Sequence, residues 1–109
     1  MIIDEKTNAI TLTRGDTGRF TVDLQTAEGD PFVPAEGDEL AFLVADEEGG
    51  TPIIAKRVMG GTTIEILPED TKDMAFGGYY YDLQLKLADG TVDTFINKAK
   101  FKVRWEAGD

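Results

Sequence analysis

The sequence predicts an all-β fold, a two-sheet sandwich or small barrel of seven to nine short strands with one short helical turn near residues 68–74. Three observations indicate this class. Apolar and polar residues alternate in several segments, which is the pattern of half-buried strands. Turn-forming residues recur at intervals of roughly 8–12 residues, as in sandwiches and small barrels. No window shows a sustained helical period of 3.6 residues.

Each expected strand has apolar residues on one face and polar residues on the other. The clearest is Tyr79–Leu87, where every second residue from Tyr79 is apolar. The segment 39–46 is apolar on both faces, which predicts a central strand covered on both sides. In the last strand, alternation directs Trp105 inward together with Phe101 and Val103. The remaining expected strands contain Ile10 and Leu12, Phe20, Val22 and Leu24, Phe32-Val33, Ile53–Val58, Thr62–Leu67 and Thr91–Ile96.

Turn signals separate these strands. Gly60-Gly61 predicts a hairpin between its two flanking strands, because hairpin turns need residues that tolerate a positive φ. Asp89-Gly90 is a two-residue hairpin signal of the same kind. The adjacent apolar pair Phe95-Ile96 breaks the alternation, which suggests a bulge around Asn97. Pro68–Met74 opens on a proline followed by acids, so one short helical turn is expected there.

Length and charge restrict the classes of partner. A chain of 109 residues holds one core, so we expect a single domain over residues 1–109. The formal net charge is −10 and the pI about 4.3. Nucleic acids and anionic membranes attract basic surfaces, so neither is an expected partner. Lys98, Lys100, Lys102 and Arg104 alternate along one segment, and we interpret them as the solvated face of a strand.

The N-terminus lacks the apolar segment of a signal peptide, so synthesis in the cytoplasm is expected. The longest apolar run, Leu40–Ala45, is far shorter than a membrane span. Redox compartment cannot be inferred, because the chain has no Cys.

The residue inventory removes most catalytic centres. His, Cys and Ser do not occur in the sequence, which excludes Ser-His-Asp and Cys-His catalysis and zinc sites with His or Cys ligands. We therefore expect no enzyme, no catalytic residue, no cofactor and no metal. One alternative is a small glycoside hydrolase using two carboxylates, from Asp46-Glu47-Glu48 or Glu69-Asp70. Both clusters fall in turns, and we interpret them as solubilising acids.

Three further alternatives rest on loops and aromatics. Loop acids supply the oxygen ligands that calcium prefers, although no EF-hand spacing is present; the candidates are Asp30, Asp38, Asp46, Glu47, Glu48, Glu69 and Asp70. Arg14-Gly15-Asp16 matches an integrin-binding tripeptide, but a turn prefers Gly and Asp for its own reasons. A sugar-stacking platform needs exposed aromatics, and alternation leaves Tyr80 pointing outward, with Phe32 and Phe76 in irregular segments.

One segment resembles the corner between strands E and F of immunoglobulin-like domains. Leu67-Pro68-Glu69-Asp70-Thr71 forms an acidic turn before Gly78-Tyr79-Tyr80-Tyr81. In those domains a Tyr hydroxyl bonds back to the backbone at the corner, two residues before a Cys. The resemblance gives Tyr79 the corner role and places Tyr81 where that Cys would be. There is no Cys pair and no Trp in the middle strand, so the sandwich is implied without antibody-type kinship.

The wider pattern is similar to the Ig-like N-terminal domain of baseplate upper proteins in phages of Gram-positive bacteria. The similarity covers nearly the whole chain and is carried by Ile10–Thr17, Glu36–Phe42, Gly78–Leu85, Asp89–Phe95 and the final strand. It implies a structural module of a phage or prophage tail or baseplate, incorporated into a virion. Its partners would be other tail subunits or further copies of itself, contacted in our hypothesis through open sheet edges. A carbohydrate-binding or adhesion module is the alternative.

Overall fold

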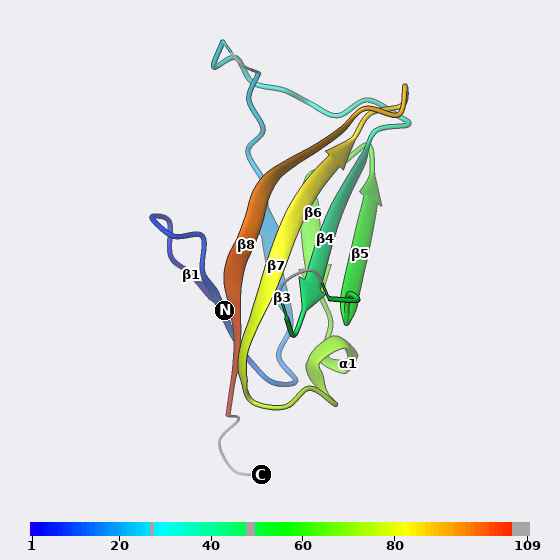
Figure 1. Ribbon diagram of the computed structural model, residues 1–109. Coiled ribbons are helices and arrows are strands. Elements are labelled where there is room, and N and C mark those ends of the chain that lie inside the picture. Colours follow the sequence, from blue (N-terminus) through cyan, green and yellow to red (C-terminus); the bar gives the residue numbers. More distant parts are fainter. Residues whose placement is uncertain (27, 48–49, 106–109) are drawn as a thin grey trace.

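The computed structural model describes residues 1–26, 28–47 and 50–105 of the chain. Within these ranges it forms eight strands and one helix (Figure 1). The elements in chain order are β1 (Ile2–Ile3), β2 (Ile10–Thr13), β3 (Gly18–Thr21), β4 (Glu39–Ala45), β5 (Ile54–Met59), β6 (Thr63–Ile66), α1 (Pro68–Thr71), β7 (Gly77–Lys86) and β8 (Val92–Arg104). The all-β class, the range of strand numbers and the short helical turn are confirmed. β1 was not predicted from the sequence.

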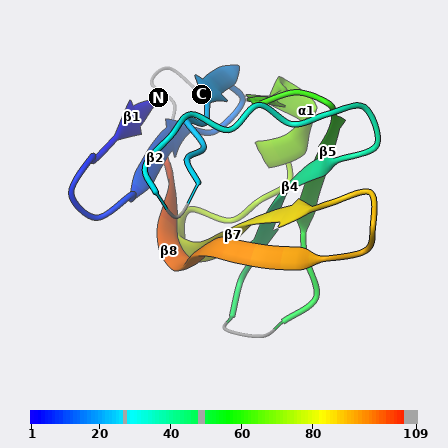
Figure 2. The ribbon, with the colours of Figure 1, turned by 90° about the horizontal axis from the view of Figure 1, so that it is seen from above.

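The strands form two sheets that face each other (Figures 1 and 2). The larger sheet has the order β1-β2-β8-β7-β4-β5, and the smaller one pairs β3 with β6. All neighbours are antiparallel except β2 and β8, which run parallel. Immunoglobulin sandwiches place strands G, F and C in one sheet and B and E in the other. β8, β7 and β4 are arranged like the first three of these strands and β3 and β6 like the last two, and the predicted two-sheet sandwich is confirmed.

The core between the sheets is centred on Phe42 of β4, which is fully buried. The ring centroids of Phe20, Tyr81 and Phe101 lie 5.5, 5.3 and 6.1 Å from that of Phe42. Such tilted and edge-on contacts are the favourable geometries of aromatic pairs. Tyr81 and Phe101 therefore face inward, as the alternation predicted.

β4 is an interior strand, hydrogen-bonded to β5 on one side and β7 on the other, as predicted. Its inward residues are fully buried. On its second face Ala41 is buried, but Leu43 and Ala45 are only half-buried. No described helix or strand lies over that face (Figure 2), so the expectation that both faces are covered is wrong. The apolar pattern instead leaves an uncovered strip on the outside of the sheet.

The predicted hairpin at Gly60-Gly61 is also wrong. β5 pairs with β4, whereas β6 pairs with β3, so the chain passes from one sheet to the other at this point. Gly60 does have the positive φ of 66° that a Gly favours. Local sequence identified the turn but not the strands that pair beyond it.

The hairpin at Asp89-Gly90 is confirmed, because β7 and β8 pair antiparallel on either side of it. Its loop is longer than the two residues expected. The amide of Leu87 bonds to the carbonyl of Thr91 at 2.8 Å, which leaves Ala88, Asp89 and Gly90 between them. Gly90 has a φ of 95°, as expected for a three-residue loop closed by a left-handed residue.

The predicted bulge around Asn97 is confirmed. The register of β7 and β8 shifts between Tyr81 and Leu83, opposite Ala99 and Ile96. Lys98 lies in this irregularity with a φ of 58°, and its amide donates a 2.8 Å hydrogen bond to Asp82. The bulge therefore has a side-chain acceptor in place of a lost ladder bond.

Trp105 does not point into the core. β8 ends at Arg104, and the side chain of Trp105 is 72% exposed. Its ring stacks on Phe76, with centroids 4.5 Å apart and planes 23° apart. The prediction failed because inward and outward side chains alternate only within a strand, and β8 ends one residue before Trp105. The predicted strand at Phe32-Val33 is absent too, and only an isolated bridge joins Gln25 to Pro31.

α1 is too short to present a helical face, since it covers Pro68–Thr71 only. Over the described ranges, no helix is long and apolar enough to cross a membrane.

Candidate functional site

The outer face of the larger sheet, pointing away from β3 and β6, is the candidate contact surface. Residues directly opposite in the strand register share a face. Tyr80 of β7 lies between Ala45 of β4 and Lys100 of β8, and Leu43 lies beside Asp82 in the next row. We define the apolar strip as Ala41, Leu43 and Ala45, the outward residues of β4. It runs along β4, the strand next to the β5 edge of this face.

Cations share the outer face of the larger sheet with the apolar strip. Register places five on this face, and all are exposed: Arg57, Lys86, Lys100, Lys102 and Arg104. Two acids, Glu39 and Asp82, share the face, and Glu39 lies 3.4 Å from Arg57. Five cations against two acids give this face a net charge of +3 in a chain of −10. The basic residues of β8 are solvated, as predicted, but they belong to a larger basic rim.

A hollow of about 710 Å³ opens on this face beside the apolar strip. The loop after β4 forms one wall, with Glu47, Gly50 and Pro52, and the bulge at Asn97 forms another. Figure 2 shows that loop standing out from the sheet on the side away from α1. Tyr80 and Leu43 line the floor, so the hollow has an apolar base within a polar rim.

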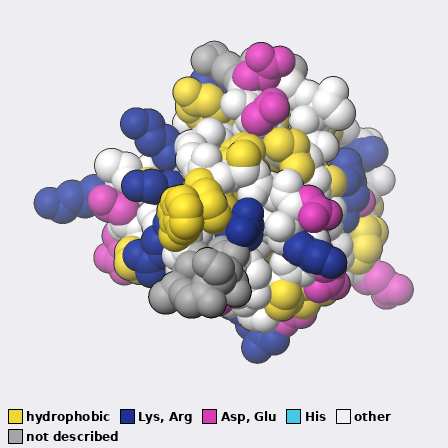
Figure 3. All heavy atoms as spheres, turned by 90° about the horizontal axis from the view of Figure 1, so that it is seen from below, with side chains coloured by type: hydrophobic (Ala, Val, Ile, Leu, Met, Phe, Trp, Pro, Cys, Tyr) yellow, Lys and Arg dark blue, Asp and Glu magenta, His cyan; other side chains and the backbone are white. Residues whose placement is uncertain are grey.

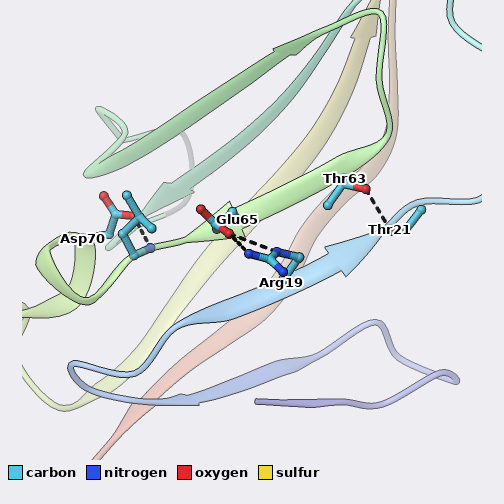
Figure 4. A network of polar contacts seen from close by, with 6 residues as sticks. Arg19, Thr21, Thr63, Glu65 and Asp70 are labelled. Atoms are coloured by element: carbon cyan, nitrogen blue, oxygen red, sulfur yellow. Dashed lines mark hydrogen bonds and ion pairs between the residues drawn. The ribbon is translucent and has the colours of Figure 1, made fainter.

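The outer face of the smaller sheet has a different character (Figure 4). Arg19 of β3 and Glu65 of β6 form an ion pair, with a 3.0 Å hydrogen bond from Nε to Oε2. The hydroxyls of Thr21 and Thr63 lie 3.0 Å apart. These cross-strand polar pairs satisfy one another in solvent, as expected of an uncovered sheet face.

The structure brings several of the candidate carboxylates together. Asp46, Glu69 and Asp70 line one hollow of about 320 Å³ with Asp73. Asp70 is already engaged, because its carboxylate lies 2.7 Å from Lys56 and accepts the Leu67 amide at 2.7 Å. Glu48 falls outside the described residues. The geometry gives Asp70 a structural role in holding α1.

The remaining calcium candidates are dispersed. Asp38 is buried, and its two oxygens accept the amides of Ala35 at 2.8 Å and Ala88 at 3.0 Å. Asp30 is exposed in the loop between β3 and β4. Among the residues that the structure describes, no group of three or more acids has the arrangement of a metal site.

The Arg14-Gly15-Asp16 tripeptide forms a turn that is tied to the rest of the fold. The Gly15 amide donates a 2.9 Å hydrogen bond to the hydroxyl of Thr71, which is fully buried in α1. Arg14 lies over the ring of Phe76, 4.3 Å from its centroid. Gly15 has a φ of 83°. Arg14 and Gly15 thus have structural roles in this turn, as the turn interpretation requires.

The corner role predicted for Tyr79 is confirmed, since its hydroxyl donates a 2.7 Å hydrogen bond to the carbonyl of Ala75. Tyr81 is buried and its hydroxyl bonds to the carbonyl of Asn8, which ties the first loop to β7. Desolvation by burial raises the pKa of Tyr81 to about 12. At the hairpin, the hydrogen bond from the Thr91 amide lowers the pKa of Asp89.

Comparison with protein-family models and with curated proteins gave no match for this chain. The sequence missed two surface features. The apolar strip was assigned to a covered face, although it lies on the outside of the sheet with Leu43 and Ala45 only half-buried; two of its three residues are alanines, which gain little free energy from burial. Trp105 was assigned to the core because the sequence did not show that the last strand ends one residue before it.

Proposed function

We propose that this domain is a non-enzymatic protein-interaction module that binds an acidic partner protein on the outer face of its larger sheet. The observation that carries the proposal is that the apolar strip and the basic rim share one sheet face, on a chain of net charge −10. Interfaces commonly combine an apolar centre with a polar rim. Opposite charge on the partner would speed association and fix its orientation.

A face contact fits this domain better than edge pairing. β5 is one of the two edge strands of the larger sheet, β1 being the other, and Lys56 on β5 turns inward to Asp70. Inward charges on edge strands discourage pairing with another strand. The apolar strip lies on an interior strand, so the inward charge of the β5 edge does not block a partner from its three residues.

The absence of catalysis is part of the proposal. The chain lacks His, Cys and Ser, and Asp70, one of the clustered acids, is bound in an ion pair. For biological setting we propose a phage or prophage tail or baseplate. Its support is the sequence resemblance to baseplate upper proteins, carried by Ile10–Thr17, Glu36–Phe42, Gly78–Leu85 and Asp89–Phe95.

The test is a pull-down from host cells during phage induction, with bound proteins identified by mass spectrometry. The wild-type chain is compared with Lys100→Glu/Lys102→Glu, which reverses the basic rim. A matched control, Lys6→Glu/Lys72→Glu, makes the same change of net charge at exposed positions elsewhere. We expect tail or baseplate proteins with the wild type and the control, and at least about tenfold less with the rim variant.

Equal recovery by all three proteins would contradict the role of the basic rim. Recovery of glycans without protein would favour the carbohydrate-binding alternative. That alternative has one observation in its favour, the exposed ring of Trp105. However, Phe76 covers one face of that ring, and Tyr80 lies on the outer sheet face rather than beside it.

A further inference from the structure

An apolar groove of about 580 Å³ lies at the end of the sandwich where β7 turns into β8. β3 ends at Thr21, so the inward faces of β7 and β8 beyond that level have only the loop after β3 to cover them. The apolar residues that line the groove are Leu24, Phe32, Leu85, Leu87, Val92 and Phe95. Five of them are half-buried and Val92 is 55% exposed. The apolar side chains at this end of the core are therefore partly exposed to solvent.

The charged residues that line this groove are both acids. Asp23 and Asp93 are exposed, and the described lining contains no cation. An apolar groove with two carboxylates at its margin fits a large apolar side chain with a cation beside it. The outer-face surface has the opposite charge, so the two sites select different groups.

The opposite end of the molecule presents such a group. Trp105 is the most exposed aromatic residue described, and Arg104 precedes it on β8. Phe76 stacks on one side of the indole and carries the Arg14 guanidinium on its ring. Figure 3 views this end from below and shows Lys and Arg side chains bordering an exposed hydrophobic cluster. Exposed Trp and Arg side chains are the residues that most often dominate binding energy at interfaces.

The groove and Trp105 of the same chain lie too far apart to contact each other. Val92 begins β8 and Trp105 follows its end, and a strand of 13 residues spans about 40 Å. The longest dimension of the molecule is 46 Å. A contact between these two sites therefore requires two molecules.

We propose that copies of this chain associate head to tail, with Trp105 of one copy inserted into the groove of the next. Arg104 of the inserted end lies beside the carboxylates of Asp23 and Asp93. Because the two surfaces differ, the contact is heterologous, and it closes into a ring or continues as a filament. This association goes beyond the proposed function; it shares Arg104 with the basic rim but does not use the apolar strip.

The net charge of −10 makes copies of the chain repel one another, and this repulsion opposes self-association. Salt weakens the repulsion and so favours association. At about 0.15 M ionic strength the screening length is about 8 Å, which suppresses repulsion between whole molecules. Charge pairs inside the contact lie closer than this and persist. We therefore expect association to strengthen as salt rises from low to physiological concentration.

Trp105 is the only Trp in the chain, so its fluorescence reports on this contact directly. Sedimentation and Trp emission are measured over a concentration series up to about 1 mM, a weak-affinity range. We expect a rise in mass with a blue shift of the emission. Trp105→Ala removes the inserted ring, and Val92→Arg blocks the groove with a cation; each weakens association at least about tenfold.

Mixing the two variants provides the decisive measurement. Val92→Arg keeps its Trp and Trp105→Ala keeps its groove, so together they form a two-chain complex that cannot grow. Its signature is a blue shift of the Val92→Arg emission when the Trp105→Ala chain is added. Tyr80→Ala, changed on the outer face, is the control and self-associates like the wild type.

A wild-type chain that stays monomeric with unchanged emission overturns the proposal. So does a symmetric dimer, in which the two variants fail to complement each other. A blue shift on adding oligosaccharide, without a rise in mass, would assign Trp105 to sugar binding instead. Failure here leaves the outer-face proposal standing, because Trp105→Ala retains the basic rim and is expected to recover the acidic partner.

Discussion

The ammonium group of Lys56 lies 2.7 Å from Oδ2 of Asp70, and this ion pair joins edge strand β5 to α1. Both side chains are partly buried, and Asp70 also accepts the Leu67 amide at the start of the helix (Figure 4). One carboxylate therefore holds α1 in place and keeps the lysine of the open edge turned inward. The contact links the stability of the fold to the protection of its edge.

Replacing Lys56 by Met should lower the free energy of unfolding by about 1–3 kcal/mol, because Asp70 is left partly buried without its cation. The double variant Lys56→Met/Asp70→Asn should recover part of this loss. Arg57→Ala is the control, since its pair with Glu39 is more exposed and should cost less than about 1 kcal/mol. Urea denaturation measures all three variants; equal losses for Lys56→Met and Arg57→Ala would refute the structural role of the pair.

Replacing Thr71 by Val should release the turn at Gly15. The buried Thr71 hydroxyl accepts the Gly15 amide, and its loss should cost about 1–2 kcal/mol. Hydrogen exchange should show faster exchange of the Gly15 amide in Thr71→Val than in Thr71→Ser, which keeps the hydroxyl. Identical exchange in both variants would mean that this bond does not hold the turn.

Stability should fall as the pH rises from about 10 to about 12. Desolvation raises the folded pKa of Tyr81 to about 12, above its ordinary value of 10.0. The unfolded chain therefore releases this proton first, and the contribution of Tyr81 is complete below about pH 10 and lost as pH rises through the folded pKa. Thermal unfolding across this range, compared with Tyr81→Phe, isolates the effect. A wild-type slope no steeper than that of the variant would contradict it.

Replacing Gly90 by Ala should destabilise the β7–β8 loop by about 1 kcal/mol, because its φ of 95° disfavours a residue with a Cβ. For a domain near this size, the melting temperature should drop by about 4–8 °C. Gly78→Ala is the matched control, since an added Cβ there meets nothing within 4 Å and φ is not positive. Scanning calorimetry compares them, and a control drop as large as that of Gly90→Ala would refute the conformational argument.

Local pattern was sufficient for the strands and several turns. Alternation identified Tyr79–Leu87 as a strand because each side chain's exposure follows from its own face of the sheet. The bulge at Asn97 and the loop at Gly90 were predictable for the same reason, since both depend on neighbouring residues. The corner hydrogen bond of Tyr79 spans only four positions, to Ala75, and a family resemblance was enough to predict it.

The sequence by itself determined the all-β class, the inventory of side chains without His, Cys or Ser, and the strongly negative net charge. Only the tertiary structure decided that β6 pairs with β3, that Trp105 lies in solvent, and that five cations share one sheet face with the apolar strip. The contact between Arg104 and Thr13 joins residues 91 positions apart, and no local pattern encodes such a pairing. Strand partners are determined by the free energy of the whole assembled core. Which residues remain at the surface follows from that pairing.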